Sequence, residues 1–197
     1  VSFGTFMGYE WSDAGWWDAS GDLSISFKPF SSLTLSTGPG INRSRSTAQY
    51  VTTVTDATAV NTYGSRYVFA DMDQFQISMT TRVNWILSPK MSLQVYMQPL
   101  ISVGDYWGFK EFARPKTYSF LRYGQDIGRI GSDADGLYTA DPDGDGPAPP
   151  FSFENPDFNF KSLRINAIFR WEWKLGSTLY FVWTQNRQDF SNPGQFS

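Results

Sequence analysis

The segment 74–87, QFQISMTTRVNWIL, alternates between polar and apolar side chains. Its odd positions are mainly apolar, whereas its even positions are polar and include Arg82 and Asn84. A period of two is the pattern of a β-strand, in which successive side chains point to opposite faces. The apolar face is long enough to cross a bilayer, for which a tilted strand needs about 9–11 residues. Because the other face must meet water or polar groups, the segment predicts the wall of a transmembrane β-barrel rather than part of a soluble sheet.

The composition excludes several classes of function. The 197 residues suit a single domain, and 16 basic against 19 acidic residues give no basic patch for nucleic acid. The sequence has no His and no Cys, which removes serine–histidine and cysteine–histidine catalysis and the usual zinc sites. The glutamates, at positions 10, 111, 154 and 172, stand in no motif that predicts a catalytic carboxylate pair. We therefore expect no enzymatic activity within this chain.

Seven segments have the pattern of β-strands: 1–11, 22–29, 32–45, 66–87, 91–112, 159–174 and 177–190. If consecutive strands are antiparallel, their connections lie at alternate ends of the sheet. The long connections are 12–21, 46–65 and 113–158, and the short ones that alternate with them are 29–31, 88–90 and 174–177. A sheet with one trimmed end and one elaborated end is typical of outer-membrane barrels, which have short periplasmic turns and long outer loops.

Aromatic side chains gather near the short connections: Phe27, Phe30, Trp85, Trp171 and Trp173. Aromatic rings are enriched at membrane–water interfaces, so this placement favours an interfacial belt over the alternative that the rings fill a soluble core. The charged residues within 66–73 and 105–111 indicate that the outer halves of the two longest strands rise above the membrane.

Three parts of the chain also resemble a known family. They are AQYVTTVTDATAVNTYGSRYVFADMDQ at 48–74, DPDGDGPAPPFSFENPDFNFKSLR at 141–164 and NAIFRWEWKLGSTLYFVWTQNR at 166–187. These stretches resemble the C-terminal outer-membrane β-barrel domain of largely uncharacterised exported bacterial proteins, which carry an N-terminal domain resembling family 9 carbohydrate-binding modules. The resemblance implies that residues 1–197 are the C-terminal portion of such a barrel in the bacterial outer membrane, with the N-terminal part and a closing strand absent. Seven strands agree with this, because single-chain bacterial barrels have even strand numbers.

One motif suggests a metal ion. Five aspartates in the connection 113–158 are candidate ligands: Asp133, Asp135, Asp141, Asp143 and Asp145. The last three alternate within DPDGDG, which matches the first half of an EF-hand calcium loop, with glycine at the sixth position. The twelfth position is Ser152 rather than the bidentate Glu of that loop. The alternatives are an irregular calcium site and a turn with solvated aspartates.

Charged residues on the polar sides of the strands are candidates for the lumen of the barrel: Arg82, Arg164, Arg170 and Glu172. A positively lined passage would favour transport of anionic or polar solutes. The alternative is a ladder of cross-strand ion pairs, such as Glu172 with neighbouring arginines, that fills the interior of a small barrel. The residues favour the ladder.

Four aromatic residues in or beside the long connections are candidates for carbohydrate binding: Trp16, Trp17, Tyr106 and Trp107. Such rings stack on sugars, but they also anchor interfaces or pack beneath loops. Three hypotheses follow. The first is a non-enzymatic barrel, surrounded by outer-membrane lipid, that anchors a surface assembly or passes a substrate. The second is a surface protein that binds or processes polysaccharide through a domain outside this chain. The third is a soluble β-sandwich.

Overall fold

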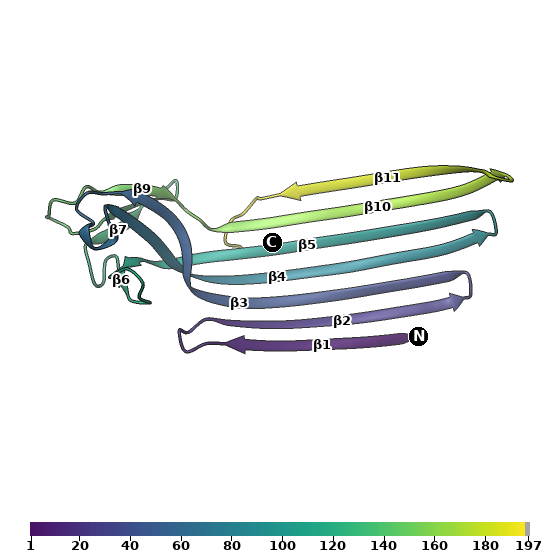
Figure 1. The fold of residues 1–197 in the computed structure, drawn as a ribbon, viewed down its shortest axis with the longest axis horizontal. Helices are drawn as coiled ribbons and strands as arrows, with labels where there is room; N and C mark the ends of the chain where they lie inside the picture. The colour runs from purple at the N-terminus through teal and green to yellow at the C-terminus, as the bar shows by residue number, and fades with distance from the viewer. Residues whose placement is uncertain (196–197) are drawn as a thin grey trace.

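The computed structural model describes residues 1–195, and the only helix in that range is one 3₁₀ turn at Val60–Thr62. Seven long strands follow one another in the main sheet, each antiparallel to the next: β1 (Ser2–Trp11), β2 (Trp17–Phe30), β3 (Leu33–Thr55), β4 (Ser65–Ser88), β5 (Met91–Phe112), β10 (Phe158–Lys174) and β11 (Ser177–Asp189) (Figure 1). The predicted all-β antiparallel fold is confirmed. Within the described residues β1 and β11 each pair on one side only, so this sheet is not closed into a barrel.

Four short strands lie in the connection between β5 and β10: β6 (Phe120–Arg122), β7 (Arg129–Ser132), β8 (Leu137–Asp141) and β9 (Phe151–Glu154). β6 pairs with the outer half of β5 and makes the main sheet eight-stranded, whereas β7, β8 and β9 form a second sheet. The sequence analysis treated this region as a loop because strands of three to five residues are too short to show a period of two. Across residues 1–195 we find no helix with the length and apolar character to span a membrane.

Two strand boundaries differ from the prediction. β2 begins at Trp17 rather than near position 22, because its first residues pair on both sides, with β1 and with β3. β3, predicted to reach position 45 or beyond, continues to Thr55, because its second half pairs with the first half of β4. The connection predicted to be long at 12–21 is therefore only 12–16. The difference between the two ends of the sheet comes from the connections 56–64 and 113–157.

The connections sort by end, as predicted. The tight turns between β2 and β3, β4 and β5, and β10 and β11 lie together at one end of the sheet, which we call the hairpin end (Figure 1). The connections 12–16, 56–64 and 113–157 lie at the other end, which we call the loop end. Gly176 enables the last tight turn, since its φ of 75° lies in the left-handed region that glycine adopts without strain.

Outside the outer halves of β3, β4 and β5, where bulges shift the pairing by one residue, the register places odd-numbered and even-numbered side chains on opposite faces of the sheet. One transverse row aligns Leu33, Trp85, Leu93 and Phe169, and another aligns Ile41, Ile77 and Ile101. We call this odd-numbered side the apolar face. The even-numbered side, which we call the polar face, carries the residues that alternate with these. The alternation first seen in the segment 74–87 therefore recurs along the sheet, although Phe6, Ile168 and Val182 are apolar residues at even positions.

Within residues 1–195, the hydrophobic core lies at the loop end. Its buried residues come from the outer halves of β4 and β5 and from the connection between β5 and β10: Val68, Ala70, Phe109, Tyr123, Ala140 and Phe153. We call the region formed by residues 46–72 and 105–157 the headpiece. Towards the hairpin end the sheet is a single layer, and both of its faces are largely accessible.

Candidate functional site

A row of polar side chains crosses the sheet on its polar face. The register aligns one residue from each long strand: Ser2, Ser26, Ser36, Arg82, Tyr96, Asn166 and Thr184. All seven are even-numbered, so their side chains leave the same face. We call this set the central polar row. It places a guanidinium, a phenol, a carboxamide and four aliphatic hydroxyl groups side by side, which supplies both donors and acceptors to a polar solute.

Arg82 is the charged centre of the row. Its guanidinium carbon lies 5.4 Å from the centre of the Tyr96 ring, which is a cation–π distance. Asn84 and Gln94 face each other two residues nearer the hairpin end, and Asn166 is opposite Tyr96. These five residues contribute to the lining of a hollow of about 270 Å³. Among the described residues Arg82 has no ion-pair partner, so the hollow presents an uncompensated cation beside carboxamides. Such a surface can hold an anionic or polar group.

The other predicted lumen residues lie on the same face. Arg164 is opposite Gln98 and Asn186, and it has no ion-pair partner within residues 1–195. Arg170 and Glu172, nearer the hairpin end, approach to 3.6 Å between Nη2 and a carboxylate oxygen. The structure thus brings the predicted residues to one face but pairs only two of them. The arrangement has features of both a positively lined passage and a ladder of ion pairs. Among the described residues, Arg82 and Arg164 are unpaired towards the middle of the sheet, whereas Arg170 and Glu172 form an ion pair near the hairpin end.

An acidic area on the polar face is not among the sites predicted from the sequence. Glu10, Asp18 and Asp22 occupy even positions of β1 and β2, and Glu10 lies directly opposite Asp18. The Asn42 amide donates to both Asp18 carboxylate oxygens, at 3.0 and 2.8 Å. Gly40 leaves room for Asp22, because a Cβ at that position would collide with its carboxylate. Acidic groups therefore occupy β1 and β2, while the unpaired arginines stand on β4 and β10. The signal is present in the even positions of 18–22, but all of these except Asp22 fall in the predicted connection 12–21.

A buried ionic network holds the headpiece together. Arg66 lies between Asp56 and Glu111, with a nitrogen–oxygen distance of 2.6 Å to each. The Tyr123 hydroxyl donates to Glu111 at 2.7 Å. Burial, reinforced by this hydrogen bond, raises the pKa of Tyr123 well above its ordinary value of 10.0. Burial alone would raise the pKa of Asp56, but hydrogen bonds from Thr58 and Arg66 hold that pKa below its usual value.

A second group of charges lies beside the first. Asp71 accepts from Lys110 at 2.7 Å and from Arg122 at 2.8 Å. The sequence analysis placed Asp71 and Lys110 above the membrane but had no basis for pairing them. Because these partners are 39 residues apart in the sequence, only the register of β4 and β5 brings them together. The two networks fix the geometry of the headpiece, and their acidic groups, Asp56, Asp71 and Glu111, are buried and paired, so we assign the networks a structural role.

The five predicted metal ligands are divided between two ends of a small hairpin. Asp133 and Asp135 lie in the turn between β7 and β8, where an Asp133 oxygen accepts two backbone hydrogen bonds. Asp141 is at the other end of β8, opposite Arg129, and Asp145 forms an exposed ion pair with Arg129 at 2.9 Å. The oxygens of Asp141 and Asp143 accept backbone hydrogen bonds from the following turn. No group of three acidic side chains in the described chain is placed to hold a metal ion. Calcium binding stays a prediction.

Two of the four predicted aromatic residues meet at Arg45. Trp17 is directly opposite Arg45 across β2 and β3, and the Arg45 guanidinium lies 5.2 Å from the centre of a Trp107 ring. Trp16 precedes this group in the exposed turn 12–16. Tyr106 has the opposite parity and packs edge-on against Phe158, with ring centres 6.5 Å apart. The structure therefore groups Trp17 and Trp107 around a cation and places Tyr106 apart from them.

Comparison of the chain with family models, with curated proteins and with solved structures finds no match.

Proposed function

We propose that this chain forms part of the wall of a β-barrel in the bacterial outer membrane, which anchors a surface assembly or passes a polar substrate and has no enzymatic role. The observation that carries the proposal is the bare apolar face. Large side chains such as Phe3, Leu179 and Trp183 are 78%, 43% and 55% exposed on it. Soluble monomers rarely expose a contiguous apolar patch larger than a few hundred Å². Lipid is the natural cover for a face of this extent.

The height of the apolar face agrees with a bilayer. From Ile77 to Leu87 along β4, ten steps of about 3.3 Å cover about 33 Å of strand. A tilt of 35–45° would reduce this to about 25 Å, the height of the apolar band of outer-membrane barrels. Above Ile77 the same face becomes charged, with Arg45 paired to Asp73. Trp85 and Trp171 stand near the hairpin end, where an interfacial belt would lie.

The two ends of the sheet give the proposed barrel a direction. In outer-membrane barrels the tight turns face the periplasm and the elaborated connections face outward. This orientation would put the hairpin end inside and the headpiece on the cell surface. The resemblance of 48–74 and 141–187 to the barrel domain of exported bacterial proteins supports the same assignment.

The polar face would line the lumen. The central polar row and the hollow beside Arg82 offer hydrogen-bonding groups and one free cation, whereas Glu10, Asp18 and Asp22 lie on the same face at β1 and β2. A lumen with separated charges favours polar solutes that carry both signs or a strong dipole. If the lumen is instead filled, the same residues would brace the wall of an anchor.

Adjacent residues on β10 allow a direct test, because the chain contains no cysteine. We expect a membrane-impermeant maleimide to label Asn166→Cys on the polar face and not Ala167→Cys on the apolar face, in the full-length protein in native membranes. Each variant serves as the control for the other, since they differ by one position in the same strand. Equal labelling of both positions, or a protein that is monodisperse without detergent, would overturn the membrane assignment.

A second function has one specific observation in its favour. Trp17 and Trp107 flank Arg45 at the loop end, which is a surface suited to stacking on sugar rings. We therefore retain surface polysaccharide as a candidate partner, with other surface proteins. Fluorescent polysaccharide bound to intact cells should fall on Trp107→Ala and not on Trp173→Ala, a matched tryptophan at the hairpin end. Equal binding by both variants would remove the glycan function and leave the barrel assignment untouched.

A further inference from the structure

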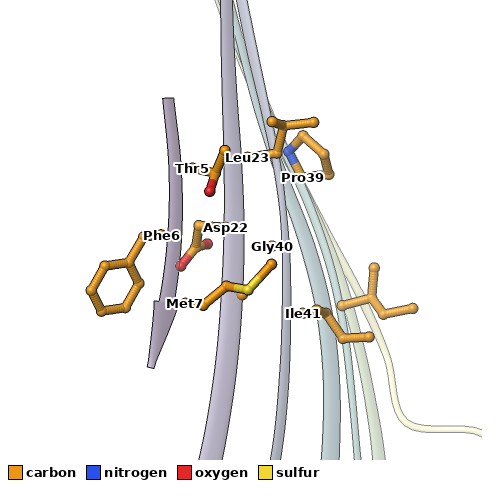
Figure 2. A pocket seen from close by; sticks show the side chains of 10 residues that line it. Thr5, Phe6, Met7, Asp22, Leu23, Pro39, Gly40 and Ile41 are labelled. Carbon is orange, nitrogen blue, oxygen red and sulfur yellow. The ribbon is translucent and has the colours of Figure 1, made fainter. Parts of the chain in front are cut away.

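The apolar face contains a groove that no side chain of the described chain fills. It is an apolar hollow of about 450 Å³, within the range of small-molecule sites, and its lining includes Gly21 of β2 and the two residues directly opposite it, Met7 on β1 and Ile41 on β3. Towards the loop end, the next residues on the same face are Ala19 on β2, Tyr9 on β1 and Arg43 on β3. Figure 2 shows Met7 extending over β2 towards β3, on the side of β1 opposite to Phe6.

No contact with residues 1–195 requires a glycine at position 21. A Cβ there would meet only Ile41 Cγ2, at 3.6 Å, which is an ordinary van der Waals distance, and its φ lies outside the left-handed region. Gly40 and Gly104 differ, since a Cβ at either would collide with a side chain of a neighbouring strand. Glycine weakens a strand, and inside one it often marks the close approach of a ligand or another backbone. The space at Gly21 therefore indicates an occupant from outside the described chain.

Arg43 stands at the loop-end limit of the groove. It follows Ile41 by two residues on the same face, about 6.6 Å along β3. Its side chain is exposed and has no ion-pair partner among residues 1–195, whereas Arg45, the next arginine on that face, binds Asp73 through two hydrogen bonds of 2.7 and 2.8 Å. The groove thus has an apolar length and a free cation at one end.

We propose that this groove binds one acyl chain of an anionic phospholipid and that Arg43 holds its phosphate. The inference rests on the proposed function, because it requires the apolar face to lie in a bilayer. The groove follows β2, which would cross the bilayer in the general direction of the acyl chains. A guanidinium donates two parallel hydrogen bonds to a phosphate, and the boundary of the apolar face is the depth at which lipid phosphates lie. If a second copy of this chain occupied the groove, its apolar surface would make no favourable interaction with Arg43. An anionic head group would form an ion pair with it.

The test measures phosphatidylglycerol and phosphatidylcholine retained by the full chain after reconstitution in an equal mixture and exchange into detergent. The chain should retain phosphatidylglycerol in preference. Gly21→Leu fills the floor without a backbone clash and should reduce retention about tenfold, since the acyl chain would lose the buried contact of about two methylene groups. Arg43→Gln should remove most of the preference, about fivefold, as expected for one cation near an anionic surface. The matched controls, Ala167→Leu on the apolar face of β10 and Arg187→Gln on β11, should retain lipid like the parent chain.

The outcomes separate the two proposals. If the maleimide test shows that the apolar face is not in the membrane, the proposed function fails, and the lipid site fails with it. If that test succeeds but Gly21→Leu and Ala167→Leu lower retention equally, lipid adheres to the whole face and the groove is not a site. If Gly21→Leu instead changes the oligomeric mass with lipid retention intact, the groove is a contact between protein chains. Either of the last two results overturns the lipid-site inference but leaves the barrel assignment intact.

Discussion

The headpiece and the single-layered part of the sheet share strands β3, β4 and β5 but meet different requirements. In the headpiece, residues such as Val68 and Asn159 at its base are fully buried, and charged side chains are buried with partners. In the rest of the sheet the largest apolar side chains remain exposed. The same strand can do both because its outer half packs beneath the connection 113–157, whereas no described residue covers its inner half. What completes the inner half must come from its surroundings.

The difference predicts two kinds of sensitivity. The headpiece should depend on specific partners, since a buried charge tolerates no loss of its counter-charge. The sheet should depend on the polarity of each face and not on individual contacts. The following substitutions test that division in order of the expected effect.

Arg66→Ala should have the largest effect. It would leave Asp56 and Glu111 buried without their cation, and breaking a buried pair in this way costs about 3–5 kcal/mol. We expect the headpiece to open locally, so that limited proteolysis cleaves within 46–72 or 113–157 while the strands towards the hairpin end stay protected. Arg114→Ala is the matched control, because Arg114 is exposed in the same region. Cleavage spread evenly over the whole chain would show that the two regions are one cooperative unit.

Val83→Arg should come next. Val83 lies near the middle of the apolar face, and an arginine at the bilayer midplane of a barrel costs about 2–4 kcal/mol. Urea unfolding in lipid vesicles should report this loss in the free energy of unfolding. Asn84→Arg places the same charge one position along β4 on the polar face and should change that free energy little. A similar loss from both would mean that the two faces do not meet different solvents.

These two regions were also unequally accessible to sequence reasoning. The faces of the sheet could be predicted because alternation is a local property that one strand displays by itself. The pairing of Arg66 with Glu111 could not, since 45 residues separate them and only the register of β4 and β5 aligns them. The same holds for the groove at Gly21. The glycine is visible in the sequence, but its walls come from β1 and β3.

The predicted sites divide along the same line. Arg82, Arg164, Arg170 and Glu172 were assigned to one side from parity alone, and the register puts them on one face. The acidic area at Asp18 was missed because its segment, rich in Gly, Ser and Asp, has the composition of a connection. Composition reflects the conformation that a segment favours in isolation. The start of β2 is a strand because it pairs with β1 on one side and with β3 on the other.

The headpiece should respond to pH at both extremes. Because the pKa of Tyr123 is raised in the folded protein, its contribution to stability is complete below its ordinary value of 10.0 and is lost as the pH rises above it. The loss should reach about 1.4 kcal/mol for each pH unit above that value. The lowered pKa of Asp56 works in the opposite sense, so its contribution is present above its ordinary value of 3.8 and declines as the pH falls through the folded pKa.

Hydrogen exchange of headpiece amides between pH 8 and 11, corrected for the intrinsic exchange rate, would measure the alkaline limb. Tyr123→Phe removes the titrating hydroxyl while keeping the ring, so the variant should be slightly less stable at neutral pH and should lack the alkaline decline. If the decline persists in Tyr123→Phe, another group causes it. Amides of β11, far from this network, provide an internal control that should not change.

Gly176→Ala should have the smallest effect and probes the hairpin end alone. Gly176 has a φ of 75°, and a Cβ there would meet no atom within 4 Å, so the only cost is the strained backbone, about 1 kcal/mol. Gly131→Ala in β7 is its matched control, because a Cβ there also meets open space while its φ is not in the left-handed region. Urea unfolding in vesicles should therefore show a small loss for Gly176→Ala and none for Gly131→Ala. At the hairpin end the described residues form no core that could transmit strain. Protease protection of the headpiece should therefore be the same in both variants. A change in that protection would show that the two regions are coupled through β4 and β5.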